Sequence, residues 1–517
     1  MNNKIQQIVI VGGGSAGWLT AAILASQYAV NDEHGIQVTL IESSTVSPIG
    51  VGEGTWPSMR STLEKIGLSE TDFLIQCDAS FKQGSKFIDW HHVNDGHYFH
   101  PFTFPVGMEQ MDLAPYWLPH KQHISFADAV TPQGHLCQKH LAPKQISTAE
   151  YAYNANYGYH LDAGKFTQVL RQHCVEKLGI THIVDHIEHI KSHNNGDIAT
   201  LITRNKQSIQ GDLFIDCSGV HGLLIEQHFG IPLKNQKNIL FNDSAWAVHV
   251  PYTDEQSPIA SCTLSTAQTS GWVWDIGLPS RRGVGHTYSS AHITDEQAEQ
   301  QLREYITPAI GATAAEQLAC RKINFNPGYR QKFWHKNCVA VGMAAGFIEP
   351  LEASALVMIE LAAQMICDQL PKTRSTMDVI AKHFNHKFSA RWEQIIEFLK
   401  LHYVLSERKE EYWLENRCSS SIPQSLLELL ELWQSNLPSR YDITDTDALF
   451  PAASYQYVLY GMGYSPAHQQ HTLRHPKQRD AEVLFNQNMQ QSKQLLAALP
   501  TNRELLNKIK QYGLPKL

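Results

Sequence analysis

Length, composition and charge exclude several classes of protein. The 517 residues are enough for two or three packed modules with a large core. Charged residues make up 18% and the formal net charge is -8, so the chain lacks the basic surface that binding to nucleic acid or an anionic membrane requires. The nine cysteines show neither paired nor zinc-like spacing, which favours reduced thiols in the cytoplasm and predicts no metal site. No segment resembles a signal peptide or a membrane span.

The chain begins with a pattern of strand, glycine turn and helix. Residues 8–11 form an apolar strand, and residues 19–25 are rich in helix-forming side chains. A second strand at 38–42 ends in Glu42, at about the distance expected for an acid that binds a ribose hydroxyl. The turn between the first strand and the helix contains the glycines Gly12, Gly14 and Gly17. This spacing predicts a dinucleotide site at the N-terminus of the helix.

The following segments are less regular. Residues 48–57 are too rich in glycine and proline for a helix or a central strand and predict a mobile loop. A helix is expected at 58–66, and residues 91–150, rich in histidine, proline and aromatics, are expected to form an irregular insertion. A helical pattern returns from Gly158 to Gly179.

Later segments alternate between buried strands and helices. Two strands end in small-residue turns near Asp216 and Gly342, far from the first glycine turn. In one-domain flavoproteins such distant segments share the contacts with the flavin, so FAD is favoured over NAD. A second glycine-rich motif for a nicotinamide cofactor is missing, and the reductant must therefore come from elsewhere. The remaining expected elements are strands at 180–190, 199–203, 247–250, 271–276 and 284–289, a helix from Pro350 to about residue 370, and a mostly helical region beyond residue 375.

Three groups of side chains are candidates for chemistry. The start of the helix after Glu352 offers backbone N–H groups that can hold a small anion, although Glu352 also fits a role as partner of the helix dipole. Lys82 and Lys86 both fit solvated lysines at a strand edge, and their spacing does not distinguish them. Trp272 and Trp274 share one face of a strand and fit core aromatics equally well.

Taken in order, these segments resemble the flavin-dependent tryptophan halogenases over nearly the whole chain. The resemblance implies an α/β fold, with a Rossmann-like FAD-binding domain of the monooxygenase (GR2) type, a mixed β-sheet and a largely helical C-terminal substrate module. We expect the FAD-binding core at 1–375 and the C-terminal module at 376–517. The motifs that carry the resemblance are Gly-Gly-Gly-Ser-Ala-Gly-Trp at 12–18, Ile-Gly-Val-Gly-Glu at 49–53, Ala-Ser-Phe-Lys at 79–82, Lys-Phe-Ile-Asp-Trp at 86–90, Asp-Cys-Ser-Gly at 216–219, Asn-Asp-Ser-Ala at 242–245, Trp-Val-Trp-Asp-Ile at 272–276 and Phe-Ile-Glu-Pro-Leu-Glu at 347–352.

The resemblance also implies a reaction. FADH₂ from a separate NAD(P)H-dependent reductase reacts with O₂ to a hydroperoxide, and a halide attacks it to give hypohalous acid. The family's catalytic lysine falls on Lys82 rather than Lys86, and would hold this acid as a haloamine or by a charge-assisted hydrogen bond. Glu352 would orient the oxidant and help to remove the proton from the attacked arene. Trp272 and Trp274 would separate flavin from substrate.

Further contacts follow from the same resemblance. The halide site falls on Ser354 and Ala355. The flavin contacts fall on Gly12, Gly14, Ser15, Ala16, Gly17, Glu42, Ser43, Ile49, Gly50, Val51, Glu53, Ile187, Met343 and Leu356.

Two departures from the family pattern affect halide and substrate. The usual Glu-Ser-Thr-Gly reads Glu-Ala-Ser-Ala at 352–355, which leaves chloride and bromide open, including a preference for bromide. The Phe-Trp-Asn run that grips the amino-acid part of tryptophan is absent from 448–454, so we expect free indole or another electron-rich arene as the substrate. The expected substrate contacts are His100, Phe102, Phe450 and Ser454.

Two alternative functions also fit the sequence. A two-component flavin monooxygenase that hydroxylates an aromatic ring shares every feature except Lys82, Glu352 and the tryptophan pair. A non-catalytic flavin carrier is a third possibility. Family habit suggests a homodimer.

Overall fold

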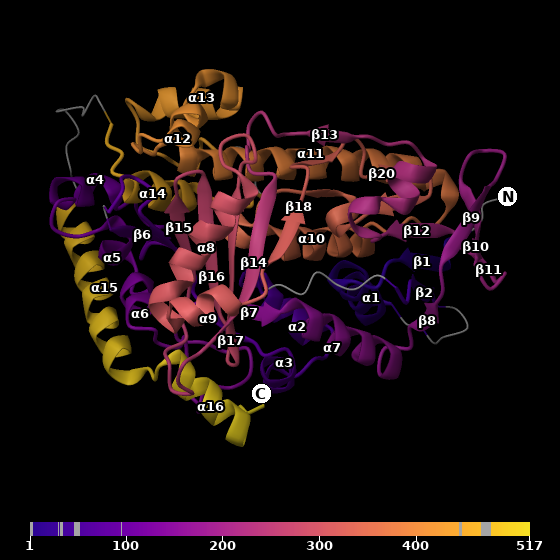
Figure 1. The fold of residues 1–517 in the computed structure, drawn as a ribbon, viewed down its shortest axis with the longest axis horizontal. Coiled ribbons are helices and arrows are strands. Elements are labelled where there is room, and N and C mark those ends of the chain that lie inside the picture. The colour runs from indigo at the N-terminus through magenta and orange to yellow at the C-terminus, as the bar shows by residue number, and fades with distance from the viewer. Residues whose placement is uncertain are drawn as a thin grey trace. The chain divides into compact units, whose positions relative to one another are not determined.

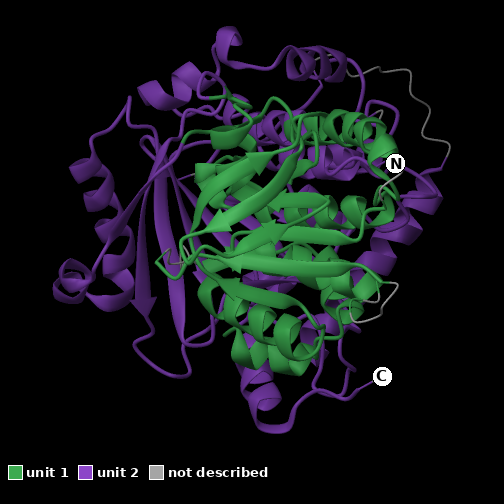
Figure 2. Ribbon diagram, turned by 90° about the vertical axis from the view of Figure 1, so that its right-hand side faces the viewer, with its two compact units in different colours: residues 1–78, 161–236, 326–392 green, residues 79–160, 237–325, 393–517 purple. Residues whose placement is uncertain are grey.

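The computed structural model describes residues 4–28, 30, 35–45, 52–94, 96–443, 447–466 and 477–516. These residues form two compact units, each assembled from three segments of the chain (Figure 2). Unit 1 comprises residues 1–78, 161–236 and 326–392, and unit 2 comprises residues 79–160, 237–325 and 393–517. The boundary expected at residue 375 stays a prediction.

Unit 1 is built on a six-stranded sheet. All neighbouring strands are parallel except at the edge, where β20 runs antiparallel to β21. The central strand β1 is followed directly by α1 (Ser15–Gln27), which contacts α7 and α10 and is buried over most of its length. In spatial order the strands are β20 (Trp334–His335), β21 (Cys338–Ala340), β12 (Leu213–Asp216), β1 (Gln7–Val11), β2 (Gln37–Glu42) and β8 (Thr181–Val184).

This parallel arrangement confirms the expected Rossmann-like α/β fold. Continuous apolar runs form its strands because both faces of the sheet are covered. Two small antiparallel sheets accompany it, with β11 (Ser208–Gln210), β10 (Ile198–Thr203) and β9 (Ile187–Ser192) in the first, and β13 (Leu233–Asn235), β19 (Gly328–Arg330) and β22 (Gly346–Phe347) in the second. The other helices of unit 1 are α2 (Ser58–Lys65), α3 (Glu70–Gln76), α7 (Ala163–Glu176) and α10 (Ser354–Asp368).

Three local expectations in the segments around unit 1 were wrong. Residues Gly52–Gly54 form the short strand β3 rather than a loop. Of the remaining residues of this segment, 48–51 lie outside the described residues, and 55–57 form no helix or strand. The segment expected to be helical from Gly158 starts with the strand β7 (Gly158–Asp162), and α7 begins only after Asp162, whose side chain accepts a hydrogen bond from the Lys165 N–H. Asp162 is therefore the N-cap of α7, a helix start that the periodicity of apolar residues did not indicate.

The apolar helix after Pro350 also begins later than expected. Leu351–Ala353 form a single 3₁₀ turn in which Glu352 and Ala353 have φ values of 62° and 55°. These left-handed conformations are unfavourable for residues with a side chain and interrupt the α-helical ladder. The helix α10 therefore starts at Ser354.

A buried carboxyl joins α2 to α10 and makes the stability of the protein depend on pH. Glu360 accepts hydrogen bonds from Ser58 (3.1 Å) and Thr62 (2.5 Å), and burial raises its pKa from 4.5 to about 7. Because the folded-state pKa lies above the unfolded value, the stability contributed by the protonated carboxyl is lost as the pH rises through about 7.

We expect Glu360→Gln to remove this pH dependence. Between pH 5 and pH 8 the wild type should lose stability through this carboxyl, whereas the variant should not. The free energy of unfolding of the variant minus that of the wild type should therefore rise by roughly 2 kcal/mol from pH 5 to pH 8. Denaturant titrations at the two pH values measure the gain. Glu64→Gln on the exposed side of α2 is the control, and an equal gain in that variant would contradict the assignment.

Unit 2 is built on a seven-stranded sheet. Its strands pair antiparallel, except that β15 runs parallel to β5. Figure 1 shows several of these long strands side by side, with α8 nearby. In spatial order they are β18 (Arg321–Asn324), β14 (Ser244–Pro251), β17 (Arg281–Tyr288), β16 (Gly271–Gly277), β15 (Thr263–Gln268), β5 (Gly84–Ile88) and β6 (His97–Pro101).

The edge strand β6 lies in the segment 91–150, which the sequence predicted to be irregular. It pairs antiparallel with β5, with His97 opposite Ile88 at one end and Pro101 opposite Gly84 at the other. The side chains of β6 from Tyr98 onward are buried. The segment thus contributes to the sheet, contrary to the expectation. The remainder of it holds only short helices, α4 (Ala114–Trp117), α5 (Phe126–Val130) and α6 (Gln133–Gln138).

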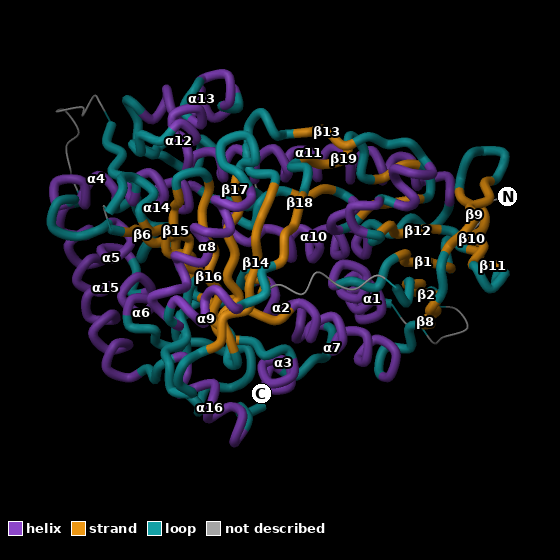
Figure 3. The backbone as a smooth tube through the Cα atoms, viewed as in Figure 1, coloured by secondary structure: helices purple, strands orange, loops and turns teal. Residues whose placement is uncertain are grey.

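Helices cover much of the remainder of unit 2, as expected for the C-terminal region (Figure 3). The long helix α11 (Arg374–Val404) begins in unit 1 and ends in unit 2. Among the described residues, no helix combines the length and the apolar character needed to cross a membrane. The other helices of unit 2 are α8 (Asp295–Ile310), α9 (Ala312–Gln317), α12 (Glu411–Asn416), α13 (Gln424–Trp433), α14 (Ala452–Gly461), α15 (Gln478–Ala498) and α16 (Asn502–Tyr512).

Candidate active site

The glycine turn of unit 1 is closely packed on one side and open on the other. A Cβ on Gly13 would lie 1.7 Å from the Glu42 carboxylate, and one on Gly17 would lie 1.9 Å from the Gly12 carbonyl oxygen. A Cβ on Gly14 would have no described atom within 4 Å apart from its chain neighbours. Gly14 is also the N-cap of α1, where N–H groups lack helical acceptors. The open space and the free donors fit the pyrophosphate of a dinucleotide.

Two acids expected to contact the flavin, Glu42 and Glu53, have defined environments. Glu42, at the end of β2, accepts a 2.7 Å hydrogen bond from His182, and the neighbouring Ser43 hydroxyl lies 3.2 Å from Nδ1 of His186. Burial raises the pKa of Glu53 to about 7, so this carboxyl can hold a proton near neutral pH.

Unit 1 contains every described residue expected to bind flavin. Ser15 lies 3.1 Å from the Thr167 hydroxyl, and a Cβ on Gly342, next to Met343, would lie 2.6 Å from the Ala16 side chain. Ile187 begins β9, and Leu356 is buried in the first turn of α10. The three expected contacts Ile49, Gly50 and Val51 lie outside the described residues.

Glu352 occupies a strained turn in the same unit. Its side chain is buried, and its carbonyl oxygen accepts a 2.8 Å hydrogen bond from the Trp56 indole N–H. Glu352 and Ala353 both have left-handed backbone conformations, which cost free energy for residues that carry a side chain. Backbone strain of this kind is concentrated at functional sites. The turn delivers Ser354, which is buried, and Ala355, which is exposed, to the first positions of α10. Glu352 thus precedes the helix and is no first-turn dipole partner.

Lys82 lies at the end of β4 (Ser80–Lys82) in unit 2 and is completely buried. The strand is held firmly, since Ser80 and Phe81 pair with β7 and the Ser80 hydroxyl donates a 2.5 Å hydrogen bond to the Gly277 carbonyl. The Lys82 ammonium lies 5.2 Å from the centre of the Phe102 ring. Burial and the charge of Lys82 lower the pKa of His160 well below its usual value, so this histidine is neutral.

Lys86 is in a different environment. It is only partly buried, donates a 2.9 Å hydrogen bond to Gln138 and lies 5.6 Å from the centre of the Phe99 ring. The alternative interpretation as a solvated lysine at a strand edge therefore does not hold for Lys82. The structure separates two residues that their spacing in the sequence did not distinguish.

The tryptophan pair is buried in β16. The centres of the Trp272 and Trp274 rings lie 6.4 Å apart, and Trp272 also contacts Trp90 at 6.2 Å. Gly285 on the neighbouring strand leaves space for Trp274, because a Cβ there would lie 2.1 Å from the indole. The pair is therefore part of an aromatic core.

Two of the expected substrate contacts of unit 2, His100 and Phe450, come together around Phe398 on α11. The ring of His100 lies 5.6 Å from that of Phe398, and Phe450 stacks on Phe398 at 3.8 Å with an interplanar angle of 12°. Tyr457 lies 6.1 Å from His100. Tyr457 lies on α14, and Ser454 is a buried residue of that helix. These contacts define a largely aromatic environment.

Comparison with known proteins identifies the family. The model of the tryptophan halogenase family matches residues 7–478. The chain belongs to the tryptophan halogenase family.

Individual relatives agree with this membership. A crystal structure of a tryptophan halogenase from Shewanella frigidimarina is 53% identical, has a TM-score of 0.96 and covers 100% of this chain and 99% of its own. The 7-chloro-L-tryptophan 6-halogenase KtzR of Kutzneria is 30% identical over 97% of this chain and 99% of its own length. The tryptophan 6-halogenase SttH of Streptomyces toxytricini is 30% identical over 88% and 89%. The protein is thus a flavin-dependent enzyme.

The two units of this halogenase contain different parts of the expected machinery. Unit 1 holds the glycine turn, Glu352 and the expected halide residues Ser354 and Ala355, whereas unit 2 holds Lys82 and the aromatic substrate contacts. The sequence missed four neighbours of these residues, namely Trp56, His160, Phe398 and Tyr457. Of these, Trp56 had a signal in the sequence, because it lies within the glycine-rich segment at 48–57.

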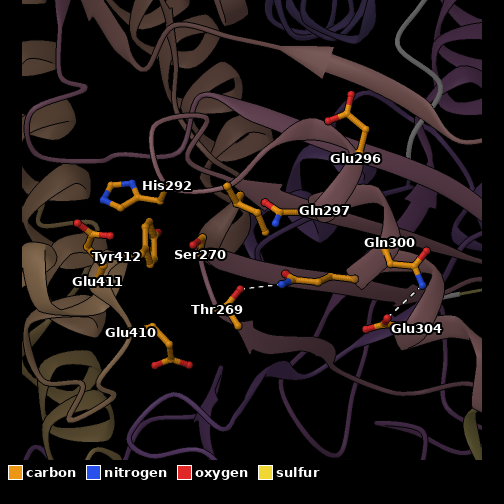
Figure 4. A pocket seen from close by; sticks show the side chains of 12 residues that line it. Thr269, Ser270, His292, Glu296, Gln297, Gln300, Glu304, Glu410, Glu411 and Tyr412 are labelled. Carbon is orange, nitrogen blue, oxygen red and sulfur yellow. Dashed lines mark hydrogen bonds between the residues drawn. The ribbon is translucent and has the colours of Figure 1, made fainter.

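A pocket of about 610 Å³ lies elsewhere in unit 2 (Figure 4). Glutamates and glutamines of α8 line one side of it, and Glu410, Glu411 and Tyr412 line the other. None of the described residues that line it belongs to the expected active site of the halogenase.

The open side of the glycine turn leads to a prediction about the cofactor. Gly14→Ala should leave the unfolding temperature of the flavin-free halogenase nearly unchanged, because the new methyl group meets no described atom. It should weaken FAD binding about tenfold or more, since the methyl group takes the space of the phosphate. Fluorescence titration with FAD measures the loss. An unchanged affinity for FAD would contradict the placement of the phosphate at Gly14. Gly13→Ala should instead destabilise the flavin-free protein, because its methyl group would clash with the Glu42 carboxylate.

Proposed function

We propose that the protein is an FADH₂-dependent halogenase that transfers electrophilic halogen from chloride or bromide to an indole or another electron-rich arene. The observation that carries the proposal is the complete burial of Lys82, an ammonium group facing an aromatic ring, in a chain of this family. A buried lysine costs free energy unless hydrogen bonds or opposite charges compensate it. Lys144 and Lys400 are equally buried and donate hydrogen bonds to backbone carbonyls. The proposal therefore rests on the burial of Lys82 together with its place in the family motif Ala-Ser-Phe-Lys at 79–82.

The cofactor belongs to unit 1 in this proposal. The open space at Gly14, the N-terminus of α1 and the Glu42 carboxylate support FAD as the bound flavin. When bound and reduced by a separate NAD(P)H-dependent reductase, FAD supplies with O₂ the oxidising equivalents that convert halide to hypohalous acid. The N–H groups at the start of α10, at Ser354 and Ala355, would hold the halide.

The two catalytic residues have distinct proposed roles. Lys82 donates a charge-assisted hydrogen bond that polarises the bond between oxygen and halogen, or carries the halogen as a haloamine. Its rigid position at the end of β4 supports this role, because β4 is held by hydrogen bonds at Ser80 and Phe81. Glu352 accepts the proton of the attacked ring carbon, and the strain of its turn supports a role in catalysis.

The proposed substrate is a free indole rather than tryptophan. KtzR and SttH are named for tryptophan substrates. The environment of His100 and Phe450 is mainly aromatic, which supports binding of a flat ring. We propose that Phe102 and Ser454 complete these contacts, and that Trp272 and Trp274 keep the substrate away from the flavin.

A competition assay tests the substrate. Equal amounts of indole and tryptophan are incubated with the protein, FAD, a generic flavin reductase, NADH, air and bromide, and the products are separated by mass. We expect halogenated indole to exceed halogenated tryptophan severalfold. Preference for tryptophan would contradict the indole proposal but would leave the halogenase proposal intact.

The same reaction distinguishes the alternative function. A two-component hydroxylase would add oxygen to the arene and would not depend on halide. Parallel reactions with chloride and with bromide compare the two halides, and a faster reaction with bromide would support an effect of Ala355. Addition of oxygen without halogen would favour the hydroxylase.

A further inference from the structure

Two adjacent histidines and a glutamate gather at one place in unit 2. His91 and His92 directly follow the buried Trp90 in the connection between β5 and β6, and Glu407 lies just beyond the end of α11. Nε2 of His91 lies 3.8 Å from Oε1 of Glu407, and Nε2 of His92 lies 3.5 Å from Oε2. The three potential ligand atoms all lie within 4.8 Å of one another.

These distances suit a shared ion better than direct hydrogen bonds. Strong hydrogen bonds between nitrogen and oxygen measure about 2.7–3.2 Å, and both contacts are longer. Ligands at about 2.0–2.1 Å from a tetrahedral zinc ion lie about 3.3 Å from each other. Small side-chain movements would therefore bring both imidazoles and the carboxylate to ligand distance.

The backbone holds the cluster in place. The Ser406 hydroxyl donates to the Trp90 carbonyl at 2.6 Å, the Glu407 N–H donates to the His91 carbonyl at 2.8 Å, and Arg408 donates to the Asp89 carbonyl at 2.9 Å. These three hydrogen bonds join two segments that are far apart in the sequence. The backbone that carries the three ligands is thus preorganised, which lowers the entropy cost of binding an ion.

The nearby cation does not occupy the site. The guanidinium of Arg408, the residue after Glu407, forms an ion pair with Glu410 and lies 5.2 Å from the centre of the Trp413 ring. Its charge is therefore neutralised by a carboxylate other than Glu407.

We propose that His91, His92 and Glu407 form a binding site for a divalent transition-metal ion of the zinc class. Two imidazoles and one carboxylate are a common ligand set for zinc, with water in the fourth position, whereas Mg²⁺ and Ca²⁺ prefer oxygen ligands. The ion ties the connection between β5 and β6 to the segment after α11. The connection leads into β6, which carries His100, and the segment follows α11, which carries Phe398. The ion therefore fixes the framework of these aromatic contacts without taking part in the reaction.

Zinc titration of the full-length protein after treatment with a chelator tests this proposal. Calorimetry should show one zinc equivalent per chain that is lost or weakened about tenfold or more in His92→Ala and in Glu407→Gln. Zinc should raise the unfolding temperature of the wild type but not of these variants. His123→Ala removes an exposed histidine outside the cluster and should behave like the wild type.

Cobalt supplies a readout of the ligands themselves. Bound Co²⁺ should give the intense visible absorption of a tetrahedral site in the wild type and in His123→Ala, but not in His92→Ala. His92 and Glu407 are 42% and 57% exposed, so the metal-free variants should unfold at the wild-type temperature. Equal zinc stoichiometry and affinity in all four proteins, or no binding by the wild type, would overturn the proposal, as would equally tight binding of Mg²⁺.

Discussion

Replacement of Lys82 by alanine is expected to abolish product halogenation, by about a thousandfold or more, while flavin oxidation and release of peroxide continue. The reason is that Lys82 is not one of the expected flavin contacts. The expected flavin contacts belong to unit 1, whereas Lys82 lies in unit 2, next to Phe102. Loss of its ammonium group should therefore remove the transfer of halogen to the substrate and leave the consumption of oxygen unaffected.

Two further variants make this result specific. Lys82→Met preserves most of the buried volume and should be as inactive as Lys82→Ala, which rules out a cavity as the cause. Lys86→Ala is the matched control, because Lys86 is partly exposed and bonded to Gln138, and it should keep most of the activity. Halogenated product, NADH oxidation and peroxide are measured in the same reaction. Retention of halogenation in either Lys82 variant would refute the assigned role.

Replacement of Glu352 by glutamine is expected to lower kcat for halogenation about a hundredfold. The amide keeps the size of the side chain but cannot accept a proton from the attacked ring. The backbone contact to Trp56 uses the carbonyl oxygen and should persist, so the turn and the flavin affinity should be retained.

The control for this variant is Glu360→Gln. Glu360 is a buried carboxyl of α10 that binds Ser58 and Thr62, and its replacement should leave kcat within about twofold of the wild type. Steady-state kinetics with indole measure both variants. An unchanged kcat in Glu352→Gln, or equal losses in both variants, would contradict a role of Glu352 in proton removal.

Local sequence patterns were sufficient where neighbouring residues determine the structure. The strand and helix on either side of the first glycine turn were predicted correctly, because the apolar run of β1 and the helix formers of α1 agree with the tertiary fold. The start of α10 was not, because proline in a favoured first-turn position does not reveal the left-handed residues Glu352 and Ala353 that follow it.

Features that depend on contacts across the sequence were harder to predict. The strand β6 is only five residues long and rich in histidine and aromatics, and its pairing with β5 becomes visible only in the fold. In the same way, Lys82 and Lys86 occupy similar local sequences. Their difference in burial depends on β7, which pairs with β4 and is distant in the sequence.

The central claim is that the protein attaches halogen to an arene. The most direct test is mass spectrometry of the product formed from indole by the wild-type protein with FAD, a generic flavin reductase, NADH and air, with bromide present or omitted. We expect a product with the isotope pattern of bromine that disappears without bromide and in Lys82→Met. A product that gains oxygen instead, or NADH consumption that yields only peroxide with every arene tested, would contradict it.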